Sequence, residues 1–207
     1  MKRRTLDLIF SIGGAALAVL LLVLGLVLQN QASFAKNYVH DQLMEQQITF
    51  TPVAGLSAKE KEAKCLVNNA GKPLTTGKQS ECYANSYIGL HVKEINDGKT
   101  YAQTSNESRT ASDEADAAMK ADPQGAKAQQ LEGQAKALAG KTDALFKGET
   151  LRGLLLTSYG FSIFGERAGQ AALVAFLAAA VLALATVAGL VHALTTPKTE
   201  RVQVLET

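Results

Sequence analysis

The sequence predicts a mainly α-helical protein in which two transmembrane helices bracket a large helical extracytoplasmic loop with one disulfide-stapled hairpin. Residues 8–28 and 171–191 predict the spans, because each run has 21 uncharged residues rich in Leu, Val and Ala. Such a run forms about 31 Å of helix, which matches the hydrocarbon core of a bilayer. The only two cysteines, Cys65 and Cys82, lie between the runs and predict the staple.

These features divide the chain into five parts. We expect a cytoplasmic tail at 1–7, a transmembrane helix at 8–28, an extracytoplasmic helical region at 29–167, a second transmembrane helix at 168–194 and a cytoplasmic tail at 195–207. Within the extracytoplasmic region we expect the disulfide hairpin at 57–95, an Ala-rich helix at 123–147 and an interfacial segment at 149–164.

Basic residues near the spans predict a plasma-membrane protein with both termini in the cytoplasm. Lys2, Arg3 and Arg4 precede the first run, while Lys198 and Arg201 follow the second. Positively charged flanks stay on the cytoplasmic side. The region between the spans has 16 basic and 16 acidic residues, so no net charge opposes its translocation.

A cleaved signal peptide is the alternative reading of the first run. Residues 2–4 would supply its basic segment, and residues 33–35 its cleavage site. However, the apolar part of a signal peptide has 7–15 residues, and this run has 21. The length favours an uncleaved anchor.

Small residues recur at helical spacing in both spans, which predicts close helix packing within the chain or between copies. These residues are Gly14, Ala18, Ala171, Ala175, Ala179 and Ala183. Alternatively, alanine and glycine are simply frequent in membrane spans. His192, at the inner end of the second span, is interpreted as reaching the solvated interface rather than as a proton relay.

The first helix is expected to continue beyond the membrane, because residues 32–47 remain compatible with a helix. Residues 48–52 break the helical period and should be extended up to Pro52.

Capping signals define the disulfide hairpin. Ser57 and Glu60 form a capping box that opens a helix carrying Cys65, and residues 68–71 end it. Ser80 is expected to cap the second helix, which carries Cys82. Residues 96–98 then form a turn. An oxidising compartment would join the cysteines, whereas two cysteines without a local histidine pair do not make a zinc site.

The region after this hairpin is poor in large apolar residues. Residues 103–121 predict a weak helix at best. Asp122 and Pro123 predict the start of the next helix, with Asp122 as its N-cap. Leu131, Leu138 and Leu145 then recur every seven residues. This stripe could form a coiled coil or pack on a neighbour such as the extended first helix, and the alternative is a mobile stalk.

The interfacial segment carries an apolar patch just outside the second span. Its members are Leu151, Leu154, Leu155, Tyr159, Phe161 and Phe164. The patch could lie on the outer leaflet, cover the hairpin core or dock a partner. Residues 165–167 are expected to turn the chain into the membrane, and Leu155→Arg is expected to disrupt the lipid or partner contact without affecting insertion.

No catalytic, cofactor or metal site is predicted. Residues 71–79 resemble a P-loop only superficially, because Gln79 stands where Ser or Thr must meet magnesium. His40, His91 and His192 do not cluster along the chain, so they predict no two-histidine iron site. No basic stripe suggests nucleic acid as a partner.

Three stretches carry a family resemblance: MKRRTLDLIFSIGG, AKCLVNNAGKPLTTGKQSECYANSYIGLH and ETLRGLLLTSYGFSIFGERAG. They resemble a group of small, Ala-rich, uncharacterised actinobacterial membrane proteins. This resemblance covers nearly the whole chain. It implies two spans with both cysteines in the outer loop, and it implies no activity.

Two classes of function fit the sequence. The first is a non-catalytic membrane protein that acts through association with another membrane protein or itself, as an accessory subunit or cell-envelope scaffold. The second is a small homo-oligomeric channel or transport component. Ser11 and Thr186 are the only hydroxyl residues in the spans, so a channel would have few groups to line an ion path.

Overall fold

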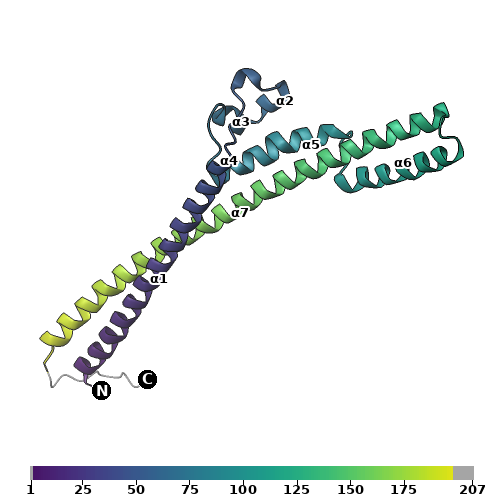
Figure 1. Cartoon of the computed structure of the whole chain (residues 1–207). Helices are drawn as coiled ribbons and strands as arrows, with labels where there is room; N and C mark the ends of the chain where they lie inside the picture. The colour runs from purple at the N-terminus through teal and green to yellow at the C-terminus, as the bar shows by residue number, and fades with distance from the viewer. Residues whose placement is uncertain (1, 198–207) are drawn as a thin grey trace, which may run out of the picture. The chain divides into compact units, whose positions relative to one another are not determined.

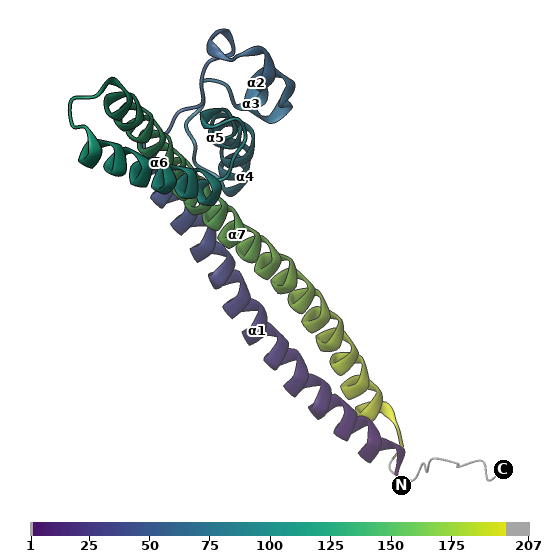
Figure 2. The same ribbon diagram turned by 90° about the vertical axis from the view of Figure 1, so that its right-hand side faces the viewer.

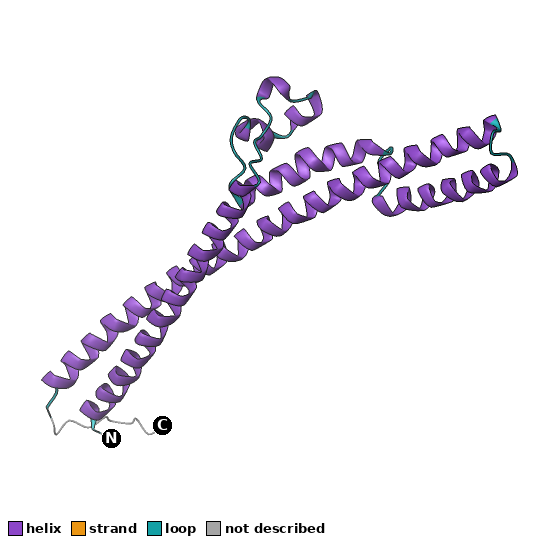
Figure 3. Cartoon of the chain, in the orientation of Figure 1, coloured by secondary structure: helices purple, strands orange, loops and turns teal. Residues whose placement is uncertain are grey.

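The computed structural model describes residues 2–197 and is mainly helical, with no strand in that range (Figures 1 and 3). Two helices, α1 (Arg3–Glu45) and α7 (Ala126–Thr195), are far longer than the others. The remaining elements are η1 (Val53–Gly55), α2 (Ala58–Glu62), α3 (Lys64–Asn69), α4 (Gly77–Cys82), η2 (Tyr83–Ile88), α5 (Gly89–Ile95) and α6 (Tyr101–Ala121).

The chain divides into two compact units, and α1 and α7 contribute to both. Within the described residues, the first unit comprises 2–37 and 163–197, and the second comprises 38–162. In the first unit α1 and α7 lie side by side in both views (Figures 1 and 2). The second unit holds all the short helices.

Helix α1 confirms that the first apolar run continues as one long helix. It ends at Glu45, just before Gln47 adopts a φ of 52°. The extended segment that follows is also confirmed. Its Phe50 N–H donates to the Lys72 carbonyl at 3.0 Å, and the Leu74 N–H donates to the Ile48 carbonyl at 2.8 Å. These bonds fasten the segment to the chain that follows α3.

The Cys65–Cys82 disulfide joins α3 to the last residue of α4, as predicted, with the Cα atoms 6.0 Å apart. The Ser57–Glu60 capping box is confirmed too, because the Ser57 N–H donates to Glu60 Oε2 at 2.6 Å. The expected single helix is instead two, α2 and α3. Ala63 separates them with an extended ψ of 94°. This break lets Leu66 reach the core, where it is fully buried.

The prediction that Ser80 caps the second hairpin helix is wrong. Thr76 is the N-cap of α4, and its side chain and that of Gln79 form a reciprocal capping box. Ser80 lies inside the helix and is completely buried. The Thr-x-x-Gln signature therefore sets the start of the helix four residues earlier than expected.

The core of the second unit forms where α1, the disulfide subdomain and α7 meet. Its buried members are Val39, Leu43, Phe50, Leu56, Leu66, Leu74, Cys82, Ala84 and Leu155. An aromatic series continues from it, since Phe50 packs edge-on against Tyr83, and Tyr83 stacks on Tyr87. Burial raises the pKa of the Tyr83 phenol. The π-helical turn η2 carries these tyrosines between α4 and α5.

Helix α6 is regular over 21 residues, where the sequence predicted a weak helix at best. Thr100 and Gln103 cap it with a second Thr-x-x-Gln box. Its buried positions are the small residues Thr104, Ser108 and Ala115. Packing on α7, beside which α6 lies in both views, adds tertiary stabilisation that the helix propensities alone do not provide (Figures 1 and 2).

The predicted helix start at Asp122 and Pro123 is also wrong. Asp122 is the C-cap of α6, and its N–H donates to the Ala118 carbonyl at 2.9 Å. Helix α7 begins only at Ala126. Leu131 of the leucine stripe lies beside Ala118 and Ala121 of α6 in a shared surface depression, and Leu145 is fully buried.

A buried polar cluster fixes the start of this α6–α7 pair. Asn96, at the end of α5, donates to Thr104 Oγ1 at 3.0 Å and accepts from Lys141 Nζ at 2.9 Å. Lys99 pairs with Glu107 at 2.7 Å, and this contact holds the pKa of the Glu107 carboxyl below its ordinary value. The turn at residues 96–98 is confirmed, with Asp97 and Gly98 both at positive φ.

The expected turn at residues 165–167 is absent, because α7 is one uninterrupted helix from Ala126 to Thr195. The segments predicted at 123–147, 149–164 and 168–194 are thus largely parts of the same helix. At Gly165 helix α7 packs closely on α1, because a methyl group added to this glycine would lie 2.7 Å from the Cβ of Ala35. The segment 149–164 is therefore not a separate interfacial helix.

Replacing Cys82 with Ser is expected to destabilise the disulfide subdomain by about 3 kcal/mol, because the open chain regains the entropy that the closed loop had lost. Limited proteolysis of residues 57–95 and thermal unfolding measure the effect. The reduced wild-type protein should behave like the variant. Equal protease resistance of oxidised wild type and variant would contradict a stabilising role for the bond.

Glu60→Gln is expected to weaken the dependence of stability on acid pH. Hydrogen bonds from the Ser57 N–H and hydroxyl hold the pKa of Glu60 below its ordinary value of 4.5. Its carboxylate therefore stabilises the fold above pH 4.5, and this contribution is lost as the pH falls through the lowered pKa. Thermal unfolding of both proteins across this range is the measurement. Parallel pH profiles would show that Glu60 carries no such linkage.

Candidate functional site

The most extensive candidate site in the first unit is the contact between α1 and α7. Six contacts define it, and they pair Asp7 with His192, Ser11 with Gly189, Gly14 with Thr186, Gly25 with Phe176, Ala32 with Gly169, and Ala35 with Gly165. In every pair the two residue numbers add up to 199, 200 or 201. The helices thus run antiparallel in one constant register from Asp7 to Ala35.

Small residues bring the two backbones together along this contact. On α1 the interface positions Ser11, Gly14, Ala18, Gly25, Ala32 and Ala35 follow the spacing of three, four and seven residues that marks a heptad seam. A methyl group added at Gly25 would collide with the ring of Phe176. Glycine is required at such positions because only a hydrogen atom leaves room for the opposite helix.

Two hydroxyl groups face glycines on the opposite helix in a reciprocal arrangement. Ser11 Oγ lies against Gly189, while Thr186 Oγ1 lies against Gly14. On each helix the hydroxyl residue lies three positions before the glycine of the same helix, Ser11 before Gly14 and Thr186 before Gly189. Ser11 is 4% exposed, and Thr186 Oγ1 is buried without a hydrogen-bond partner. Both hydroxyls are enclosed by the helix pair.

The residues predicted for helix packing fall into two groups. Gly14, Ala18, Ala175 and Ala179 lie in the α1–α7 contact or are buried. Ala171 and Ala183 are exposed, and Ala172 is buried next to Ala171. At its N-terminal end, the buried stripe of alanines therefore runs through Ala172 instead of Ala171.

His192 and Asp7 form the polar end of the same contact. His192 Nδ1 lies 2.9 Å from Asp7 Oδ2, and about half of the histidine side chain is exposed. A bond between residues 185 positions apart in the sequence could not be deduced from spacing alone. Its geometry joins the ends of the two helices at the level where both apolar runs stop.

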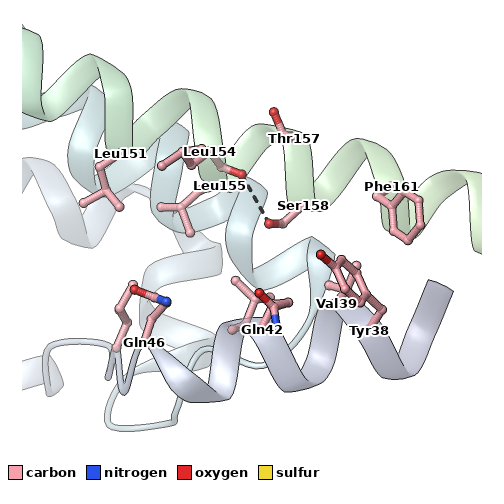
Figure 4. A pocket seen from close by; sticks show the side chains of 12 residues that line it. Tyr38, Val39, Gln42, Gln46, Leu151, Leu154, Leu155, Thr157, Ser158 and Phe161 are labelled. Carbon is pink, nitrogen blue, oxygen red and sulfur yellow. Dashed lines mark hydrogen bonds between the residues drawn. The ribbon is translucent and has the colours of Figure 1, made fainter. Parts of the chain in front are cut away.

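A groove in the second unit is the other candidate site. It encloses about 380 Å³ between the C-terminal part of α1 and the middle of α7 (Figure 4). Its lining comprises Tyr38, Val39, Gln42, Leu43, Gln46, Ile48, Leu151, Leu154, Leu155, Thr157, Ser158 and Phe161. Tyr38 and Phe161 meet edge-on at one end, with ring centroids 5.7 Å apart.

The groove is apolar in its floor and carries amides along one wall. Val39, Leu43 and Leu155 are buried beneath it, while Gln42 and Gln46 extend from α1 (Figure 4). The hydroxyls of Thr157 and Ser158 donate to carbonyls one turn earlier in α7, at 2.9 and 3.2 Å. They therefore present little unsatisfied polarity, so the groove suits an apolar segment with a polar edge.

The six residues of the predicted apolar patch do not act as one surface. Leu151, Leu154 and Phe161 line the groove and are 38%, 63% and 37% exposed. Leu155 is 3% exposed and belongs to the core cluster. The backbone of Tyr159 lies against Gly77 of α4, and Phe164 lies in the first unit. The expectation that Leu155→Arg probes only a surface contact is therefore wrong, because the substitution would bury a charge in the core.

Each of the three histidines lies beside a different acidic residue. His40 contacts Asp41, His192 contacts Asp7, and His91 Nε2 lies 3.7 Å from Glu60 Oε1. Between residues 2 and 197 no group of three His, Cys, Asp or Glu side chains is close enough to hold a metal ion.

Sequence reasoning missed the register of the helix pair and the wall that α1 gives the groove. The heptad repeat of small residues in α1 was a usable signal for the first. Gln42 and Gln46 gave no signal for the second, because exposed glutamines are common on helices.

Comparisons of the chain with protein-family models, curated protein sequences and solved structures give no match.

Gly165→Ala and Gly160→Ala are expected to have opposite effects on stability. Both glycines lie in α7, but a methyl group at Gly160 meets no atom within 4 Å, whereas one at Gly165 meets Ala35. Gly160→Ala should stabilise the protein by about 1 kcal/mol through helix propensity. Gly165→Ala should destabilise it by about 1–3 kcal/mol through overpacking. Thermal unfolding in a mild detergent compares them, and a stabilising Gly165→Ala would contradict the close contact.

Proposed function

We propose that this chain is a two-pass integral protein of the plasma membrane that acts without catalysis, through helix association. In this proposal it serves as an accessory subunit or a cell-envelope scaffold. Residues 8–28 and 168–194 span the bilayer, and the region between them is extracytoplasmic.

The register of α1 and α7 is the observation that carries this proposal. Because paired residue numbers add up to about 200, residues 8–28 lie opposite 172–192. The second apolar run was defined independently as 171–191. The two runs therefore coincide within one residue, or about 1.5 Å of helix. Such alignment of two apolar bands is expected of helices that cross the same hydrocarbon layer.

Exposure of the apolar side chains gives further support. Both helices are long and apolar enough to cross a membrane, and only 17% of the most apolar stretch of each is buried. Phe10, Leu26 and Leu184 are 74%, 62% and 73% exposed. A core helix of a soluble protein would be buried, whereas lipid-facing side chains are exposed in a single chain. A bilayer would cover this surface.

The orientation is inferred from charge. Lys2, Arg3 and Arg4 lie at the end of α1 that we place in the cytoplasm. Lys198 and Arg201, which give the same indication for the other tail, lie outside the described residues. With this orientation, the disulfide falls on the oxidising side of the membrane.

The groove supports a role in association. Three exposed apolar side chains, Leu151, Leu154 and Phe161, line a depression beside the two glutamines. Exposed apolar surface rimmed by polar groups is typical of protein interaction sites. We infer that the groove accepts a segment of another membrane protein or of a second copy.

The channel alternative has less support. An ion path needs polar groups that face it. The span hydroxyls Ser11 and Thr186 instead face glycines inside the helix pair, and each is covered by the neighbouring helix. They would line a pore between copies only if the pair separated.

Leu154→Arg is expected to abolish association while leaving insertion intact, because it places a charge in the groove without disturbing the core. The tagged wild-type protein should stay in alkali-washed membranes of its own host, and its native mass in mild detergent should include a partner. The Leu154→Arg variant should also stay in the washed membranes, but its native mass should no longer include the partner.

Val53→Arg is the matched control, because Val53 is 47% exposed and does not line the groove. It should retain the partner. Leu155→Arg should instead unfold the second unit. An unchanged native mass for Leu154→Arg would contradict the role of the groove, and release of the wild type by alkali would contradict membrane insertion.

A further inference from the structure

Four exposed side chains form a band in the first unit at the outer end of the apolar runs. Phe34 and Lys36 come from α1, and Phe164 and Arg167 come from α7. The contact between Ala35 and Gly165 places the four residues at one level of the helix pair. Phe34 is 55% exposed and Phe164 is 75% exposed.

The composition of this band matches the chemistry of phospholipid headgroups. Aromatic side chains concentrate at membrane interfaces, and Lys or Arg side chains near helix ends reach the phosphate level. Glu166 is the acidic residue in this band, so the band carries a net positive charge. The Arg167 guanidinium donates to Gln170 Oε1 at 3.0 Å, which leaves further N–H groups available for phosphate.

The position along each helix agrees with this chemistry. Arg167 precedes the second apolar run by four residues, or about 6 Å of helix, which falls within the headgroup layer. Phe34 follows the first run by six residues, or about 9 Å, and Phe164 precedes the second by seven, or about 10 Å, so both lie at the outer edge of this layer. Side chains lean toward the N-terminus of a helix, a direction that leads back toward the apolar run in α1 and away from it in α7.

We propose that Phe34, Lys36, Phe164 and Arg167 form a belt that binds the phosphate and glycerol region of outer-leaflet phospholipids. The belt fixes the depth of the helix pair in the bilayer. This inference rests on the proposed membrane insertion, and it assigns the lipid contact to this belt instead of to the whole segment 149–164. Leu151 and Leu154 remain accessible to a protein partner.

Single-tryptophan variants of the full chain test the belt, because the natural sequence contains no tryptophan. Phe34→Trp and Phe164→Trp report on the belt, and Leu177→Trp, at a 60% exposed position, reports on the middle of the second run. Leu154→Trp reports on the groove. Each variant is reconstituted into phosphatidylcholine–phosphatidylglycerol vesicles whose acyl chains are brominated either near the glycerol or near the chain middle.

The belt tryptophans should be quenched more by bromine near the glycerol, and Leu177→Trp more by bromine at the chain middle. Leu154→Trp should escape both. Belt tryptophans that escape quenching while Leu177→Trp is quenched would overturn the belt and leave insertion intact. Absence of quenching for Leu177→Trp as well would overturn the proposed insertion itself.

The cationic part of the belt is tested by adding Lys36→Gln and Arg167→Gln to Phe34→Trp. Loss of the phosphate contacts should reduce the preference for bromine near the glycerol. Lys127→Gln with Lys136→Gln removes the same charge from the second unit and should leave the quenching ratio unchanged. An unchanged ratio in the Lys36 and Arg167 variant would overturn their assignment to lipid phosphate.

Discussion

The close approach of α1 and α7 is the constraint on which the first unit depends. Two helices can approach closely only where small side chains leave room for the partner, and on α1 glycine, alanine and serine supply that surface from Ser11 to Ala35. In lipid this packing matters more than burial, because acyl chains are as apolar as leucine and dispersion between fitted surfaces has to hold the helices. Most leucines and valines of the two apolar runs are exposed, while the small residues face the opposite helix.

The second unit is held together in a different way. It buries large side chains such as Phe50, Leu66 and Leu74 behind short helices. A region of this size, with few large apolar residues between residues 100 and 144, gains from additional fastening. The disulfide, three reciprocal capping boxes and the Asn96 cluster provide it. The proposed membrane location accounts for this contrast, because water favours burial of large apolar groups, whereas lipid leaves shape complementarity as the main driving force.

Features that depend on neighbouring residues could be predicted most reliably from the sequence. The apolar runs, the extension of the first helix, the disulfide and the Ser57 capping box could all be predicted, because each rests on neighbouring residues or on the composition of one run. The same logic was available at Thr76–Gln79 and Thr100–Gln103, and its use would have placed the starts of α4 and α6 correctly. Tertiary contacts could not be predicted in this way. Gly165 looks like a turn residue until Ala35 is known to lie against it.

Leu154 and Leu155 show why the candidate site needed the structure. Adjacent in sequence and identical in chemistry, they have exposed fractions of 63% and 3%. A helix turns by 100° per residue, so one of two neighbours can face the core while the other lines the groove. A helical pattern identifies an apolar face, but it does not say which neighbour covers that face. In this chain the core cluster covers Leu155, so the surface available to a partner is set by Leu151, Leu154 and Phe161 on α7 and by the glutamines of α1 opposite them.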